Sequence, residues 1–248
     1  MAEPALLLTV AASFLLAGTV KGVIGLGLPT VSLALMTLAL DLPSAMALLL
    51  VPSFVTNLSQ ALVGGHAKVV LRRIGPFLLM ASVTVWIGAL ALTRVRLPLL
   101  SGLLGVSLVV YAGVNLAGYR PTVSARNETW VGPLLGAING ILTGMTGGSA
   151  VPGVLYLQAI GLPRDLLIQA MGMLFAVSTL ALAGAMGANG LLTADLGVLS
   201  AAAVVPAILG MGLGQRLRHR LSERRFRQVF FVSLLALGLY FVVRAIGR

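Results

Sequence analysis

The chain has 248 residues, of which 58% are hydrophobic and only 9% are charged. A soluble domain usually carries about 25% charged residues, so this composition cannot cover a surface in water. The net charge of +11 comes mostly from basic residues in short gaps between apolar segments. That pattern indicates membrane topology rather than nucleic-acid binding. The composition therefore predicts an all-α polytopic membrane protein.

Cysteine is absent from the sequence, which excludes thiol nucleophiles, disulfides and thiolate metal sites. Two histidines and six scattered acidic residues form no cluster at membrane depth that would suit catalysis or a metal ion. We therefore expect no enzymatic activity, no metal and no cofactor. The first 20 residues lack a basic n-region and a clear cleavage site, so we interpret them as mature protein.

The first apolar segment, residues 4–40, is too long for one crossing, because about 36 helical residues would span about 54 Å. Its middle, residues 21–29, holds three glycines and a proline, which are poor material for a continuous helix. We expect a broken helix here. Three ordinary spans are predicted to follow, at residues 43–64, 74–92 and 97–118.

The second half of the chain repeats this order. A polar connector, residues 120–129, separates a first repeat at 1–119 from a second at 130–248. The second repeat opens with a long apolar segment, residues 130–160, which is broken between 139 and 152. Ordinary spans are predicted at residues 165–186, 195–213 and 226–246. Three glycines recur 122 residues later, since Gly18, Gly22 and Gly25 match Gly140, Gly144 and Gly147.

The basic residues distinguish two topologies. If each broken segment crosses the membrane once, the halves are parallel and Lys and Arg split 9 to 7. If each broken segment returns to its own side, the halves are inverted and the split is 12 to 4, with Lys21 left out because it lies within a segment. The larger group is Lys68, Arg72, Arg73, Arg120, Arg126, Arg164, Arg216, Arg218, Arg220, Arg224, Arg225 and Arg227; the smaller is Arg94, Arg96, Arg244 and Arg248.

The 12-to-4 split favours inverted repeats, because cytoplasmic loops are enriched in Lys and Arg. This topology predicts cytoplasmic loops at residues 65–73, 119–129 and 214–227, and places both termini outside. Each repeat then consists of a broken helix, either a re-entrant hairpin or a short paired crossing, and three transmembrane helices.

Two matched breaks predict a midplane substrate site between inverted repeats, because irregular backbone survives in a membrane only inside protein or beside a water-filled cavity. Pro29 and Pro152 suit the first turn of a new helix, whose free N–H groups and positive dipole end attract anions. The side chains that we expect to assist are Lys21, Asn57, Thr143, Thr146 and Ser149.

Each of these side chains also has a purely structural interpretation. Lys21 either serves the site or extends its ammonium to the headgroups from a helix end. Asn57 and Gln60 share a helix face and either line the cavity or tie helices together by hydrogen bonds. The same choice applies to Gln169 and to residues 178–179. Single glycines in membrane helices often serve close packing alone.

The runs at residues 18–27 and 140–148 resemble the two glycine signatures of the sulfite exporter TauE/SafE family, also called the toluene sulfonate uptake permease family. The Leu-Pro pairs at 42–43 and 162–163 fit as well, and the resemblance covers essentially the whole chain. It implies transport of sulfite, sulfonates or sulfoacetate, mostly across bacterial inner membranes. By position it assigns the substrate site to Gly22, Gly25, Gly27, Gly144, Gly147 and Gly148.

We therefore expect a secondary transporter of a small, sulfur-containing anion that works by alternating access. Its partners would be the anion, the lipid bilayer and a coupling proton or sodium ion, with no nucleic acid. An anion channel is the main alternative, and a membrane enzyme or a structural membrane subunit are weaker ones. Substrate identity, transport direction, coupling ion and oligomeric state stay open at this point.

Overall fold

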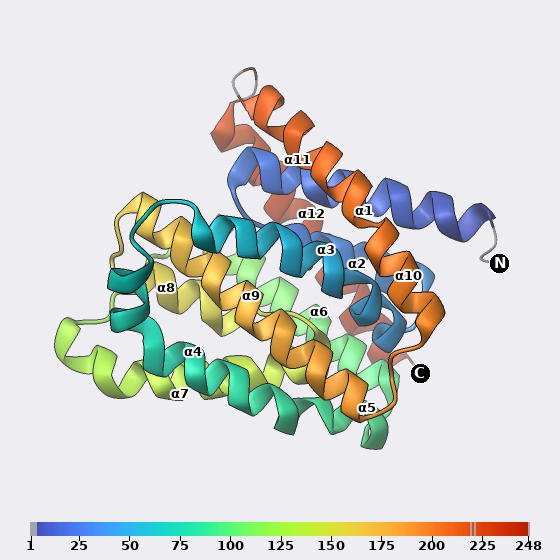
Figure 1. The fold of residues 1–248 in the computed structure, drawn as a ribbon, viewed down its shortest axis with the longest axis horizontal. Helices are drawn as coiled ribbons and strands as arrows, with labels where there is room; N and C mark the ends of the chain where they lie inside the picture. The colour runs from blue at the N-terminus through green and yellow to red at the C-terminus, as the bar shows by residue number, and fades with distance from the viewer. Residues whose placement is uncertain (1–3, 219, 221, 248) are drawn as a thin grey trace.

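Helices account for the chain apart from short turns, and no strand occurs among the residues that the computed structural model describes, which are 4–218, 220 and 222–247 (Figure 1). The first half contains α1 (Pro4–Ile24), α2 (Leu28–Ala39), α3 (Leu42–Leu62), α4 (Ala67–Ala89), α5 (Ala91–Arg94) and α6 (Leu97–Leu116). The second half contains α7 (Ala125–Thr146), the π-helical turn η1 (Ala150–Val154), α8 (Leu155–Ala159), α9 (Arg164–Ala188), α10 (Ala194–Ala202), α11 (Val204–Arg218) and α12 (Glu223–Ile246).

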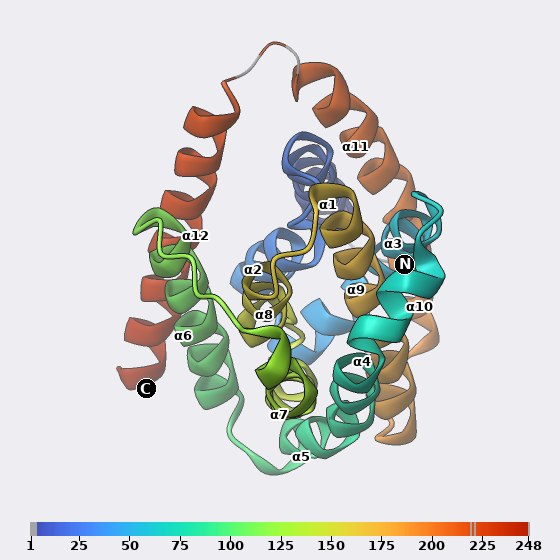
Figure 2. The ribbon, with the colours of Figure 1, turned by 90° about the vertical axis from the view of Figure 1, so that its left-hand side faces the viewer.

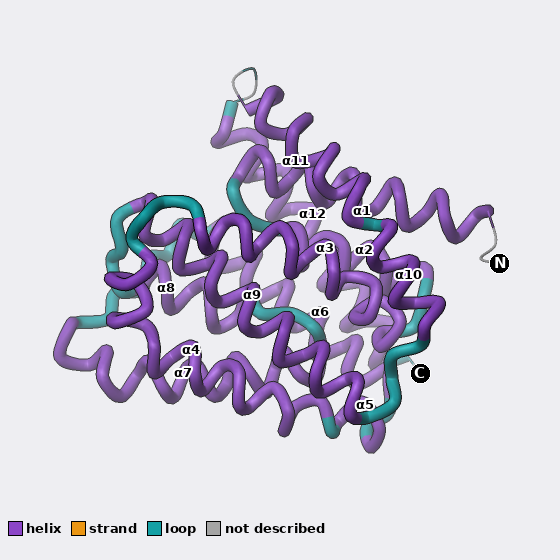
Figure 3. Tube along the Cα trace, viewed as in Figure 1, coloured by secondary structure: helices purple, strands orange, loops and turns teal. Residues whose placement is uncertain are grey.

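Seven helical spans in the described chain are long and apolar enough to cross a membrane, which confirms the predicted fold class. They are α1, α3, α4 with α5, α6, α9, α10 with α11, and α12. Two shorter apolar helical pieces, residues 28–39 and 150–159, are the second arms of the two broken segments. Both predicted interruptions are therefore present, and they appear as teal stretches of the tube in Figure 3.

Two predicted helix starts were too late. The structure begins α4 at Ala67 rather than near residue 74, and begins α7 at Ala125, inside the predicted connector. These early turns carry Arg73 and Glu128, which form an ion pair of 2.7 Å between α4 and α7. Apolar periodicity marks only the part of a helix that faces lipid or core, so polar first turns escape it.

Glycines bring the two halves of the chain into direct backbone contact. A Cβ atom at Gly140 in α7 would overlap the carbonyl oxygen of Ala81 in α4, and one at Gly144 would overlap that of Val85. The same arrangement joins α1 to α11, where Gly18 faces Ala207 and Gly22 faces Met211. Residue numbers rise together in both pairs, so α7 runs parallel to α4 and α1 runs parallel to α11.

Two other helix pairs run antiparallel. The side-chain amide of Gln60 in α3 donates to the carbonyl of Ile168 in α9 at 2.7 Å, while Ser53 lies 3.3 Å from Thr179. In the α6–α12 pair, Gly102 faces Ala245, and Gly105 faces Gly238 and Phe241. Figure 2 shows α6 and α12 side by side on one flank, with α2 and α8 in the middle of the bundle.

These pairings and the short loops between helices fix every direction. Helices α1, α3, α6 and α11 run one way, while α4, α7, α9 and α12 run the other way (Figure 1). Since α1 and α3 are parallel, α2 must carry the chain back between them, and α8 does the same between α7 and α9. The start of α1 and the end of α12 consequently lie at the same end of the bundle.

The glycine contacts predict a position-specific loss of stability. Replacing Gly140 with Ala places a methyl group against the Ala81 carbonyl and the Thr84 hydroxyl, and overpacking of this kind costs about 1–3 kcal/mol. Gly113 in α6 is the matched control, because nothing lies within 4 Å of a Cβ added there. Thermal unfolding in detergent should show a lower midpoint for Gly140→Ala and no loss for Gly113→Ala. Equal midpoints would contradict the packing described here.

Candidate functional site

The first break is built by glycines in a conformation that other residues rarely adopt. Gly25 has φ of 83° and Gly27 has φ of 109°, both in the left-handed region that favours glycine. Helix α2 begins at the next residue with a proline in its first turn, and no side chain caps it. The N–H groups of Leu28 and Thr30 at this terminus therefore have no capping side chain.

Lys21 lies one turn before this break and is buried, with 4% of its surface exposed. Its ammonium donates to the hydroxyl of Thr56 at 3.1 Å and to the side-chain oxygen of Asn57, both on α3. The side chain therefore points into the protein and does not extend to the headgroups. Of the two interpretations of Lys21, the structure supports an interior role.

A chain of polar side chains continues from Lys21 through the core. The Asn57 amide donates to the Ser53 hydroxyl at 3.0 Å, and Ser53 lies 3.3 Å from the Thr179 hydroxyl. The chain connects α1, α3 and α9, and all its members are buried. Sequence reasoning found Asn57 but missed Ser53 and Thr56, although residues four apart on a helix share a face.

Gln60 and Gln169 form a separate tie between α3 and α9. Gln60 donates to the carbonyl of Ile168 at 2.7 Å, and Gln169 donates to the carbonyl of Ala61 at 2.8 Å. Each glutamine thus reaches the backbone of the other helix. Their interpretation as helix ties, rather than cavity residues, agrees with these bonds.

The hydroxyl groups at the second break form hydrogen bonds within their own segment of the chain. Gly147 has φ of 77°, and the Thr143 and Ser149 hydroxyls lie 3.0 Å apart across the break. Thr146 donates to the Leu142 carbonyl at 2.7 Å and accepts from the Gly148 N–H at 3.2 Å. These groups stabilise the irregular backbone around residues 147–149.

Asn139 is a buried neighbour of this break that sequence reasoning missed. Its side-chain oxygen accepts from the Gly153 N–H at 2.9 Å, while its amide nitrogen has no hydrogen-bond partner among the described residues. Asn139 lies in the apolar part of α7, immediately before Gly140. A polar amide inside a membrane helix was therefore the sequence signal that could have identified it. The structure gives the second break one free donor.

The two breaks contact the same helix at different levels. Gly147 packs against Met46 of α3 and Leu33 of α2, whereas Lys21 bonds to Thr56 and Asn57. The positions 46 and 57 are about 16 Å apart along the axis, at 1.5 Å per residue. The structure therefore separates the predicted site residues into two polar clusters along α3. Gly22 and Gly144 belong to neither cluster, because they pack against α11 and α4.

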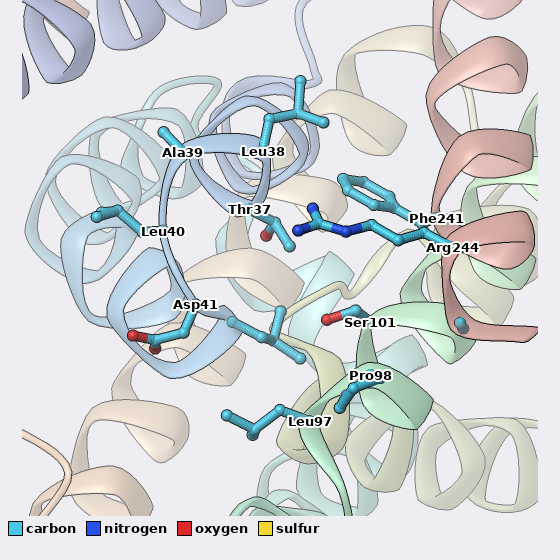
Figure 4. A pocket seen from close by; sticks show the side chains of 12 residues that line it. Thr37, Leu38, Ala39, Leu40, Asp41, Leu97, Pro98, Ser101, Phe241 and Arg244 are labelled. Carbon is cyan, nitrogen blue, oxygen red and sulfur yellow. The ribbon is translucent and has the colours of Figure 1, made fainter. Parts of the chain in front are cut away.

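A cavity of about 380 Å³ opens at the end of the bundle that holds the start of α1 (Figure 4). The end of α2, the start of α6 and the end of α12 enclose it. Arg244 extends across it towards Thr37, and Ser101 lies on the facing helix. One cation and two hydroxyls thus line this mouth, with Asp41 at its edge.

A model of the family described as Sulfite exporter TauE/SafE matches residues 10–241, which is nearly the whole chain. No curated protein and no solved structure matches the chain.

The polar chain around Lys21 predicts that Asn57 stabilises the fold. Asn57→Leu would leave the Lys21 ammonium and the Ser53 hydroxyl each short of a buried partner, at a cost of about 1–3 kcal/mol for each. Asn189→Leu is the control, since Asn189 bonds only to the Ala185 carbonyl of its own helix. Thermal unfolding should show a clear loss for Asn57→Leu alone. Similar losses in both variants would argue against a stabilising network at Lys21.

Proposed function

Because the chain belongs to the sulfite exporter TauE/SafE family, we propose that it is a secondary transporter that moves a small sulfur-containing anion, such as sulfite or a sulfonate, by alternating access. Family membership itself makes the chain a membrane transporter and not an enzyme. The observation that supports the anion site is the buried cation Lys21 beside the first break.

The ammonium group of Lys21 has one hydrogen-bond donor that is not used within the described part of the protein. An ammonium group has three N–H donors, and Thr56 and Asn57 accept two of them. Both partners are neutral, so the positive charge has no counter-ion among the described residues around it. A cation buried without a counter-ion inside a membrane protein costs free energy. An anionic substrate would offset that cost by supplying the missing charge and the third acceptor.

The backbone of the first break completes this proposed site. Gly25 and Gly27 carry no side chain to keep an anion away from the main chain. The uncapped start of α2 offers N–H groups and the positive end of a 12-residue helix. Lys21, the glycines and the α2 terminus then surround the anion with donors, and Asn57 orients the ammonium.

The second break would form the next position on the same route. Its free donor is the Asn139 amide, with the Thr143 and Ser149 hydroxyls beside it. Thr146, Gly147 and Gly148 hold the backbone around it. Because both breaks contact α3, this helix would be the common wall along which the anion passes between the two levels.

Opposite helix directions in the two halves support inverted repeats at residues 1–119 and 130–248, joined by the connector 120–129. The α1–α11 and α7–α4 contacts mean that each broken helix is clasped by a helix of the other half. In alternating access, the unit of α1 and α11 would tilt against the unit of α7 and α4. The route would then open at one end of the bundle as it closes at the other. A proton or sodium gradient would drive the cycle.

The charges support an orientation in a bacterial inner membrane. The described residues of the larger basic group lie where α3, α6 and α11 end and where α4, α7, α9 and α12 begin. Arg94, Arg96 and Arg244 lie at the opposite end, and Arg248 falls outside the described residues. The richer end would be cytoplasmic by the positive-inside rule, with both termini external.

This orientation predicts opposite labelling of two exposed threonines. The chain contains no cysteine, so Thr122→Cys in the connector and Thr93→Cys in α5 each introduce a unique thiol at an exposed position. A membrane-impermeant maleimide should label Thr93→Cys in intact cells and should label Thr122→Cys only after permeabilisation. The reverse pattern would invert the orientation, and equal labelling would reject this topology.

The proposed anion site predicts that Lys21→Met strongly reduces transport. Loss of a charged hydrogen-bond donor weakens binding by about 1.5–3 kcal/mol, so sulfite uptake into proteoliposomes should fall at least tenfold. Lys68→Met is the matched control, because Lys68 is the other lysine of the chain and is exposed. Wild-type uptake should also be concentrative and collapse when the driving proton or sodium gradient is dissipated by a protonophore or a sodium ionophore, which a channel would not show. Unchanged uptake by Lys21→Met would remove Lys21 from the site.

A further inference from the structure

Three adjoining cavities form a basic vestibule at the end of the bundle opposite the start of α1. Their volumes are about 150, 290 and 660 Å³, and they share Asn115 and Arg227 as lining residues. The end of α6, the start of α9 and the start of α12 enclose them. The arginines that line the vestibule are Arg120, Arg164, Arg224 and Arg227.

The charge of this vestibule is unbalanced. Among the side chains that the structure describes, no aspartate or glutamate lines any of its three cavities. Within the described residues, the one ion pair joins Arg73 to Glu128, so none of the vestibule arginines has an acidic partner there. The cavity in Figure 4 differs, because it combines one arginine with Asp41 at its edge. A concave site lined by a single sign of charge concentrates ions of the opposite sign.

Tyr111 supplies the second observation. It is 1% exposed, lines the innermost cavity, and its hydroxyl has no hydrogen-bond partner in the described structure. Buried hydroxyls almost always have a partner, so an orphaned one that lines a cavity is available to a ligand or a water in that cavity. The ring packs edge-on against Phe231 at 5.5 Å, and the Arg227 guanidinium lies 5.9 Å from the centre of the Phe231 ring. Phe231 thus holds the arginine and the tyrosine at one cavity.

The inner wall of this cavity is the first break itself. Ile24 and Leu26 flank Gly25 and line the cavity together with Met171 of α9. A Cβ added at Gly27 would contact the ring of Phe230, the neighbour of Phe231. The vestibule therefore leads from solvent at the basic end to the break that follows Lys21.

We propose that Arg164, Arg227 and Tyr111 form a second anion-binding site, in which a small oxyanion is held before or after it occupies the site at Lys21. The inference rests on the proposed transport function and adds a loading site to it. The guanidinium groups donate pairs of N–H bonds to the oxygens of the anion. The Tyr111 hydroxyl donates to a further oxygen, and the apolar wall of Ile24 and Leu26 excludes water from its far side.

Lipid phosphate has the same chemistry as a soluble oxyanion, so the test separates the two sources. Equilibrium binding of radiolabelled sulfite is measured on the purified full chain in detergent without anionic lipid, and in nanodiscs with and without phosphatidylglycerol. The variants are Arg227→Gln, Arg164→Gln and Tyr111→Phe. Arg225→Gln is the matched control, because it removes a charge two positions away on the same helix but does not line the vestibule.

The loading site predicts at least a tenfold rise in the dissociation constant of the vestibule site for Arg227→Gln and Arg164→Gln. Tyr111→Phe should raise it about threefold, and Arg225→Gln should change it less than twofold. The thermal midpoint of each variant checks that it is folded. Phosphatidylglycerol should leave sulfite binding unchanged.

Three results would overturn the loading site. If Arg227→Gln binds sulfite as Arg225→Gln does while wild-type proteoliposomes still transport sulfite, the vestibule is no site but the transporter stands. If phosphatidylglycerol displaces sulfite from the wild type but not from the vestibule variants, the arginines bind lipid headgroups. If the wild type neither binds nor transports sulfite or methanesulfonate, the proposed function fails as well.

Discussion

Irregular backbone inside a membrane needs protein around it, and the rest of this structure follows from that constraint. Two breaks leave N–H and C=O groups without helical partners, and each such group costs several kcal/mol if lipid surrounds it. Each broken helix also packs against a helix of the other half. Gly18 and Gly140 occupy equivalent places in these contacts, since each faces a backbone carbonyl, of Ala207 and Ala81 respectively. The halves therefore cannot form separate domains.

The equivalence of the two halves ends at their polar groups. Thr143 stands 122 residues after Lys21, so the second break has a hydroxyl where the first has a cation. Lys21 bonds across to α3, whereas Thr143 bonds within its own segment to Ser149. In our proposal, this buried cation makes the first break the position that holds the anion. In our proposal, the second break then passes the anion on instead of holding it.

Much of this architecture could be predicted from the sequence. Composition identified a membrane protein, and excess length together with glycine and proline located both breaks. The charge count favoured helices that double back, which agrees with the directions found for α1, α2 and α3. The helix start at 67 was missed because the basic residues at 68, 72 and 73 indicated a loop. The start at 125 was missed because the polar turn with Glu128 carries no apolar signal.

The site was harder to predict than the fold, because its neighbours come from distant positions. Lys21 and Asn57 were both candidates, but nothing in the spacing of 36 residues showed that they touch. Tyr111 and Asn139 were not considered, since an orphaned hydroxyl or amide becomes visible only when its surroundings are known. We expected one cluster of polar groups at the midplane, but the structure distributes these groups over two levels along α3.

The central claim is that a buried ammonium beside a broken helix is the counter-ion of the transported anion. Crystals grown with selenite, a heavier analogue of sulfite, would test it by anomalous diffraction. Our account predicts a selenium peak about 3–4 Å from the ammonium nitrogen of Lys21, as a hydrogen-bonded oxyanion requires. A selenium peak elsewhere in the protein, with none beside Lys21 in the same crystals, would contradict it.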